Sequence, residues 1–129
     1  MVIGVGIDLT EIARLERMLD GKGTRALERL FTDAELAYAR GRARPAMHLA
    51  ARVAAKEAAF KALSGTDDAR LIGWREVEVV SHDGRSPSLS FHGRAAVRAT
   101  VLRVGRTHLS LTHTDRTAGA VVVLESGED

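Results

Sequence analysis

The sequence predicts a single α+β domain, in which helices pack on an antiparallel sheet. Five segments read as short strands, and the last four of them form two pairs joined by polar turns: residues 2–8, 76–80, 88–91, 108–113 and 118–124. Most helical segments lie together after the first strand, so the order does not follow alternating βαβ units and favours antiparallel pairing. At 129 residues the chain suits one domain, which we place at 1–125, with a polar tail at 126–129.

The first strand has one face that is almost free of side chains. Gly4 and Gly6 alternate with apolar residues and are followed on the same face by Asp8. A helix then covers residues 11 to about 19, where apolar residues recur at helical spacing. Asp8 or Thr10 can cap this helix, so Asp8 is either an N-cap or a functional carboxylate.

Three further helices are predicted. Thr32 followed by Glu35 is the pattern of a capping box, which begins a short helix that ends near residue 39. An alanine-rich helix covers residues 45–63 and is the strongest helical segment of the chain. The last helix spans 94–104, and Gly105 ends it.

The composition is that of an ordinary globular protein and excludes several classes of site. There is no cysteine, so disulfides, thiolate zinc sites and thiol nucleophiles are ruled out. No apolar run approaches membrane length, and the first residues lack the features of a secretory signal, so we expect a cytoplasmic protein without a membrane segment. A formal charge of +2 and 4% aromatic residues argue against a nucleic-acid-binding module.

Arginines are clustered in two places. Arg14 and Arg17 lie on the first predicted helix, and Arg40, Arg42 and Arg44 lie in one predicted loop. Both clusters suit an acidic partner or a phosphate-bearing substrate, but they also suit solvated surface charges. Composition leaves both interpretations open.

The alanine-rich helix carries two separate charged rows. Projected at about 100° per residue, Glu57 and Lys61 share one edge, and His48, Arg52 and Lys56 share another. Glu57 and Lys61 can form an ordinary ion pair one turn apart. The functional alternative is a Mg²⁺ site, because Mg²⁺ prefers oxygen ligands and binds one or two carboxylates together with substrate phosphates. Asp8 could supply the second carboxylate.

His113 is the most informative of the five histidines. It ends a predicted strand beside Ser110, Thr112 and Thr114, a segment dense in hydrogen-bond donors. It could contact a phosphate or an adenine edge, or it could be a strand-end histidine with a structural hydrogen bond.

Several motifs, taken in order, resemble the holo-acyl-carrier-protein synthase family of phosphopantetheinyl transferases. The resemblance covers nearly the whole chain. Its motifs are GVGIDLTEI at the N-terminus, FTDAELAY at 31–38, LAARVAAKEAAFKAL at 49–63, WREVEVVSHDGRSPSLSFHG at 74–93 and HLSLTHT at 108–114. The chain departs from the family at Ala51, where glycine is common, and at Val53, where an aromatic residue is usual.

The resemblance implies a reaction and a set of site residues. A carrier-protein serine would attack the β-phosphorus of coenzyme A, with either Glu57 or a metal-bound water as the base. The implied roles are Mg²⁺ binding by Asp8 and Glu57, phosphate contact by Lys61, coenzyme A binding by Arg52, Gly65, His113 and Thr114, and docking of the acidic acyl carrier protein by Arg14.

The family resemblance also implies a homotrimer with active sites between subunits, which agrees with the small size of the chain. The carrier could serve fatty acid or polyketide synthesis. A metal-dependent phosphodiesterase or nuclease is the competing hypothesis, since two carboxylates and Mg²⁺ also hydrolyse phosphate esters.

Overall fold

One long helix lies between two antiparallel sheets in the computed structural model, which describes residues 1–21, 23–64, 69 and 71–127. The elements, in chain order, are β1 (Val2–Glu11), α1 (Ile12–Asp20), α2 (Thr24–Leu30), α3 (Asp33–Arg40), α4 (Pro45–Leu63), the 3₁₀ helix η2 (Trp74–Glu76), β2 (Val77–His82), β3 (Arg85–Phe91), α5 (Gly93–Val101), β4 (Val104–His113) and β5 (Thr117–Ser126).

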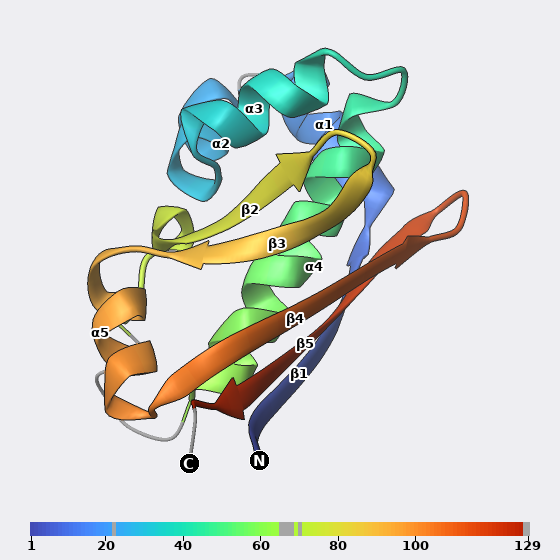
Figure 1. Ribbon diagram of the computed structural model, residues 1–129. Helices are drawn as coiled ribbons and strands as arrows, with labels where there is room; N and C mark the ends of the chain where they lie inside the picture. The colour runs from blue at the N-terminus through green and yellow to red at the C-terminus, as the bar shows by residue number, and fades with distance from the viewer. Residues whose placement is uncertain (22, 65–68, 70, 128–129) are drawn as a thin grey trace.

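The strands form a three-stranded sheet of order β1-β5-β4 and a two-stranded sheet of β2 and β3. All pairs are antiparallel, which confirms the predicted α+β class and divides the expected sheet into two. Helix α4 packs on the three-stranded sheet, and the β2–β3 sheet packs on another flank of α4, where β3 contacts β4 (Figure 1). No helix of the described part of the chain is long and apolar enough to cross a membrane.

The bare face of β1 lies directly against α4. A Cβ atom on Gly4 would overlap the carbonyl oxygen of Ala62, and one on Gly6 would overlap that of Ala58. Only glycine lets the strand approach the helix backbone this closely. The opposite face, with Val5, is solvent-exposed in this chain.

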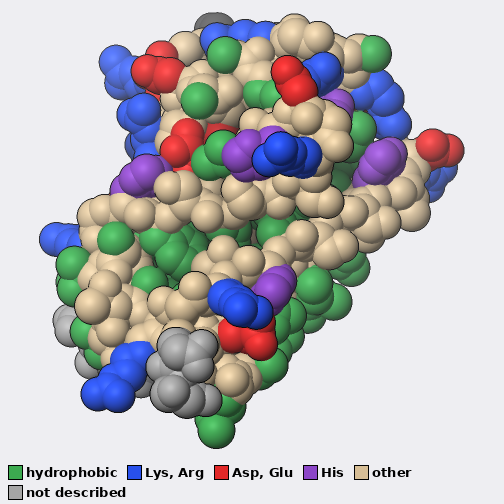
Figure 2. Space-filling model, viewed as in Figure 1, with side chains coloured by type: hydrophobic (Ala, Val, Ile, Leu, Met, Phe, Trp, Pro, Cys, Tyr) green, Lys and Arg blue, Asp and Glu red, His purple; other side chains and the backbone are tan. Residues whose placement is uncertain are grey.

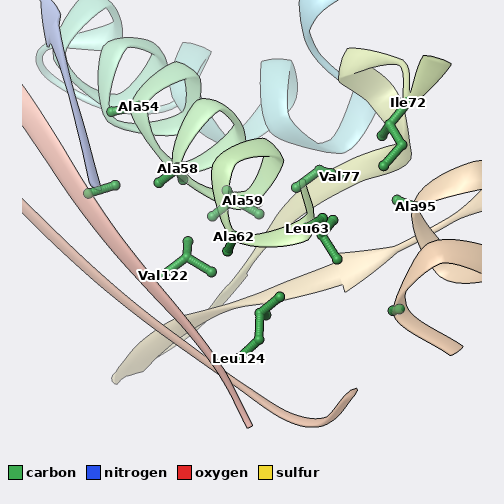
Figure 3. Packing of buried hydrophobic residues seen from close by; sticks show 14 residues of the cluster. Ala54, Ala58, Ala59, Ala62, Leu63, Ile72, Val77, Ala95, Val122 and Leu124 are labelled. Carbon is green, nitrogen blue, oxygen red and sulfur yellow. The ribbon is translucent and has the colours of Figure 1, made fainter. Parts of the chain in front are cut away.

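Alanines on α4 make the matching surface. Ala54, Ala58 and Ala62 are at most 5% exposed and face Val122 and Leu124 of β5 (Figure 3). The small side chains let the helix and the sheet lie close together, so this part of the core is densely packed without large side chains. The alanine-rich pattern predicted the helix, and its small side chains explain how closely the sheet approaches it.

A buried ion pair fixes the second sheet to α4. Lys56 and Glu35 have no exposed side-chain surface, and Lys56 Nζ lies 2.8 Å from Glu35 Oε1. Lys56 also donates to the carbonyls of Trp74 and Val77, at 2.9 and 2.6 Å, and Glu35 Oε2 accepts from Val79 N at 2.8 Å. Each buried charge is thus matched by several partners, as burial requires.

The predicted capping box is confirmed. Thr32 Oγ1 accepts from Glu35 N, and Glu35 Oε1 accepts from Thr32 N at 2.8 Å. Glu35 therefore serves as a helix cap as well as the partner of the buried lysine.

Several element boundaries differ from the sequence expectation. Helix α2 was not predicted. Its N-cap residue is Gly23, which has no side chain and therefore gives no capping signal in the sequence. Helix α5 ends at Val101 and Gly105 belongs to β4, because Arg103 takes a positive φ of 61° and turns the chain earlier. His82 and Pro87 lie in β2 and β3 rather than in the turn between them.

Two expectations at the chain's ends also change. The N-cap residue of α1 is Glu11, and Asp8 lies within β1 opposite Ala120, so the capping hypothesis for Asp8 is wrong. Strand β5 extends through Ser126, where the polar tail was expected to begin.

We expect Gly6→Ala to destabilise the protein by about 1–3 kcal/mol or more, because the new methyl group overlaps backbone rather than a movable side chain. Urea unfolding measures the loss. Gly41→Ala is the matched control, since the nearest atom to its Cβ would be 3.6 Å away and its φ is −82°. Equal stability of the two variants would contradict the close contact of β1 and α4.

Candidate functional site

Two groups of functional side chains lie on opposite flanks of α4. Glu57 and Arg52 are five residues apart, which corresponds to about 140° around the helix. Glu57 lies on the flank that faces β1, and Arg52 faces β2 and β4. The two charged rows predicted from the sequence are therefore confirmed.

The first group is the carboxylate cluster, formed by Asp8, Glu57, Lys61 and Arg14. Lys61 Nζ lies 2.9 Å from Asp8 Oδ1 and donates to the Ile7 carbonyl at 2.9 Å. Arg14 Nη1 lies 3.9 Å from Glu57 Oε1. Among the described residues, Glu57 and Lys61 do not form an ion pair with each other. Glu57 pairs with Arg14, and Lys61 pairs with Asp8.

The glycine face of β1 positions this cluster. Because Gly4 and Gly6 let β1 lie on α4, Asp8, two residues further along the same face, comes within hydrogen-bonding reach of Glu57. The side chain of Asp8 is only 14% exposed, and that of Glu57 is 31% exposed. Two carboxylates thus share one partly desolvated site.

This setting raises the pKa of Glu57 to about 7. Desolvation by burial is the largest cause, and the hydrogen bond and the negative charge of Asp8 add to it, while Arg14 and Lys61 act in the opposite direction. The site destabilises the charged form of this carboxyl group, and a cation bound nearby would stabilise it.

The donor set fits a hard divalent cation. Asp8 Oδ2 is buried and, when both carboxyl groups are charged, accepts no hydrogen bond from the residues that the structure describes, so one carboxylate oxygen is available beside Glu57. Among the described residues no group of three or more His, Cys, Asp or Glu side chains could hold a metal ion. A cation here would take its remaining ligands from substrate or water, as Mg²⁺ commonly does.

The second group lines a cavity of about 330 Å³, which we call the basic pocket. Elements α3, α4, β2, β3 and β4 surround it, and histidine and basic side chains gather around the hollow in the upper part of the face shown in Figure 2. Its charged and aromatic lining residues are Tyr38, His48, Arg52, His82, Arg85 and His113.

Arg52 is the buried cation of this pocket. It is 3% exposed, and its Nη2 donates to Ser81 Oγ at 2.6 Å while Nη1 donates to the His48 carbonyl at 3.1 Å. Its Nε is buried and has no hydrogen-bond partner in the described part of the chain. The guanidinium also lies over the Tyr38 ring, 4.4 Å from the centroid. A buried, partly unsatisfied guanidinium lining a cavity suits an anionic ligand.

The structure brings the predicted residues together only in part. Asp8, Glu57, Lys61 and Arg14 meet in one cluster, and Arg52 and His113 line the other site. Thr114 closes the β4–β5 turn, where its Oγ1 accepts from Thr117 N at 3.1 Å. Gly65 lies outside the described residues.

Four of the six charged and aromatic residues that line the pocket were not predicted from the sequence. Tyr38, His82 and Arg85 come from α3 and the β2–β3 hairpin, and no local pattern showed that these elements lie over Arg52. His48 could have been found, because helical projection already placed it on the edge of Arg52.

Comparison with known proteins identifies the family. Residues 4–121 match the model of the 4′-phosphopantetheinyl transferase superfamily. The chain belongs to this superfamily. Two relatives named holo-[acyl-carrier-protein] synthase come from Geobacter sulfurreducens, at 43% identity over 97% of this chain and 98% of that protein, and from Maridesulfovibrio salexigens, at 45% over 97% and 99%.

Solved structures of phosphopantetheinyl transferases share the fold. The holo-(acyl-carrier-protein) synthase of Bacillus anthracis, in complex with CoA (3′,5′-ADP), is 35% identical with a TM-score of 0.76, and the similarity covers 98% of each chain. The holo-[acyl-carrier-protein] synthase of Neisseria meningitidis is 25% identical with a TM-score of 0.83, covering 98% of this chain and 100% of that one.

In the cation-free transferase we expect Asp8→Asn to lower the pKa of Glu57 below its value of about 7, because the variant removes the neighbouring negative charge while burial remains. Arg14→Gln should raise this pKa, since it removes a neighbouring positive charge. Carbon-13 NMR titration of the glutamate carboxyl groups measures both. An unchanged Glu57 pKa in Asp8→Asn would show that the two carboxylates do not interact.

Proposed function

We propose that this chain transfers 4′-phosphopantetheine from coenzyme A to a serine of an apo acyl carrier protein and releases adenosine 3′,5′-bisphosphate. The observation that carries the proposal is the pairing of Asp8 with Glu57 and Lys61 at the contact of β1 with α4. The relatives named holo-[acyl-carrier-protein] synthase and the solved complexes with coenzyme A support it.

Asp8 and Glu57 would hold Mg²⁺, which fits the free buried oxygen of Asp8 and the raised pKa of Glu57. The ion would neutralise charge on the diphosphate of coenzyme A, the main requirement of phosphoryl transfer. Lys61, whose side chain is 57% exposed, can turn from Asp8 to a phosphate oxygen. These residues position the diphosphate for in-line attack.

In the reaction a bond forms between the serine oxygen and the β-phosphorus, and the bond from that phosphorus to the bridging oxygen breaks. The electron pair leaves with adenosine 3′,5′-bisphosphate, and the serine proton passes to a base. The base would be either Glu57 or a water whose pKa the ion held by Asp8 and Glu57 lowers. Lys61 would stabilise the developing charge on the leaving phosphate.

The basic pocket would hold the nucleotide end of coenzyme A. Arg52 and His113 line it, and both suit the 3′-phosphate. Gly65 and Thr114, assigned to coenzyme A binding by family resemblance, remain predictions.

Separation of the two groups supports an active site shared between subunits. The α4 helix, about 10 Å across, stands between the carboxylate cluster and the basic pocket of one chain. The outer face of β1 is also apolar, with Val5, Ile7 and Leu9 exposed by 58, 64 and 70%. Such a stripe is typical of a subunit interface. We therefore propose a homotrimer in which one subunit's carboxylates face its neighbour's pocket.

Arg14 would dock the acidic carrier protein. Its side chain is 46% exposed on α1 and lies beside Glu57, so a carrier bound there would bring its serine to the carboxylate cluster. The nature of the pathway, fatty acid or polyketide, and the cytoplasmic location stay predictions.

The direct test incubates the protein with coenzyme A, Mg²⁺ and an apo carrier protein, and weighs the carrier by mass spectrometry. We expect a phosphopantetheine mass gain that EDTA abolishes. Glu57→Gln should lose transfer by at least about 100-fold and bind Mg²⁺ more weakly, because it removes a charged ligand. Glu28→Gln, on the exposed surface of α2, is the control and should keep activity. Hydrolysis of coenzyme A without a carrier would instead favour the phosphodiesterase hypothesis.

Co-expression of two inactive variants tests the shared site. Asp8→Ala disables the carboxylate half of the site, and Arg52→Met disables the pocket half. A homotrimer of either variant alone should therefore not transfer phosphopantetheine. In randomly mixed trimers about one quarter of the sites would combine two intact halves and regain activity. If each site lies within one subunit, the mixture stays as inactive as the separate variants.

A further inference from the structure

His48 lies in the basic pocket one helical turn before Arg52. Its ring packs edge-on against Tyr38, with the centroids 5.6 Å apart and the planes at 82°. Its backbone carbonyl accepts a hydrogen bond from Arg52 Nη1 at 3.1 Å. Tyr38, which also lies against the Arg52 guanidinium, therefore holds the ring in place among the pocket's lining residues.

The ring nitrogens of His48 are not used by the fold. Within the described residues, no side chain or backbone group forms a hydrogen bond with them, whereas His82 Nε2 pairs with Ser88 and His92 Nε2 with Glu78. A half-buried imidazole that lines a cavity, with both nitrogens available, can donate to a ligand.

Positive groups surround this ring. Burial is the largest cause that lowers the pKa of His48, and Arg52, Arg42 and His113 lower it further by their charge. Tyr38 packs on the ring, and His82 and Arg85 complete the charged lining of the pocket from β2 and β3. None of these neighbours is a carboxylate, so a bound anion is what would favour the protonated ring.

We propose that His48 is a specificity-determining residue, whose protonated ring donates a hydrogen bond to the terminal phosphomonoester of the bound nucleotide. This rests on the proposed function, which places the nucleotide end of coenzyme A in the basic pocket. His48 then makes the enzyme prefer coenzyme A to its analogue without the 3′-phosphate, and makes this preference depend on pH.

The sign of the pH dependence follows from linkage. A phosphate dianion stabilises the protonated ring, so the pKa of His48 is higher in the complex than in the free protein, and binding takes up a proton. The contribution of His48 to affinity is therefore small above the pKa in the complex and grows as the pH falls toward the pKa in the free protein. The phosphate itself protonates near pH 6, so comparison with a variant is needed to isolate the histidine.

Isothermal titration of the full-length protein with coenzyme A and with 3′-dephospho-coenzyme A, at pH 6 to 8.5, tests the proposal. His48→Phe keeps an aromatic ring against Tyr38 but cannot donate. At pH 6.5 we expect this variant to bind coenzyme A at least about tenfold more weakly, the loss typical of a charged hydrogen bond. Binding of 3′-dephospho-coenzyme A should change less than about twofold, and proton uptake on binding coenzyme A should fall.

Other outcomes separate the possible failures. If Arg52→Met does not weaken coenzyme A binding, the nucleotide lies elsewhere and the proposed pocket is wrong. If Arg52→Met weakens it but His48→Phe does not, or weakens both ligands equally at every pH, the pocket stands and the role of His48 is overturned. Should His48→Phe fail to fold, His48→Gln tests the pH dependence instead: glutamine can donate a hydrogen bond but does not ionise, so the preference for coenzyme A should no longer rise as the pH falls, and an unchanged pH dependence would overturn the role of His48.

Discussion

The close contact of β1 with α4 is the constraint on which the rest of the site depends. Gly4 and Gly6 have no side chains, and the facing residues of α4 are alanines. The backbone of β1 therefore packs directly against the backbone of α4. Asp8 continues the glycine face and is thereby placed beside Glu57. Burial at this contact, together with the hydrogen bond and the negative charge of Asp8, raises the pKa of Glu57 to about 7, and a nearby cation would favour the charged carboxylate. The packing of β1 on α4 therefore also sets the geometry of the carboxylate cluster.

The other flank of α4 is organised by a different interaction. Lys56 and Glu35 form a fully buried ion pair that also binds backbone groups of η2 and β2. This network holds the second sheet over α4, so that Ser81 reaches Arg52 and the basic pocket closes around it. Because Lys56 and Glu57 are neighbours in the chain, one short segment of helix governs both halves of the site.

Much of this arrangement follows from local sequence. The bare strand face, the capping box at Thr32 and the two charged rows of α4 each depend on residues a few positions apart, and each is found as predicted. What could not be predicted depends on long-range packing. Glu35 was recognised as a cap, but its pairing with Lys56 joins α3 to α4, and the placement of Arg85 and His82 depends on how the β2–β3 hairpin lies over the helix.

The separation of the basic pocket from the carboxylates matters for inhibitor design. A small anionic heterocycle can occupy the space around Arg52 without approaching Asp8 or Glu57 of the same chain, which lie on the other flank of α4. With the nucleotide site that we propose, such a compound would compete with the nucleotide end of coenzyme A and would not need a chelating group. Avoiding metal chelation removes a common source of poor selectivity, because chelators bind divalent ions in unrelated enzymes as well.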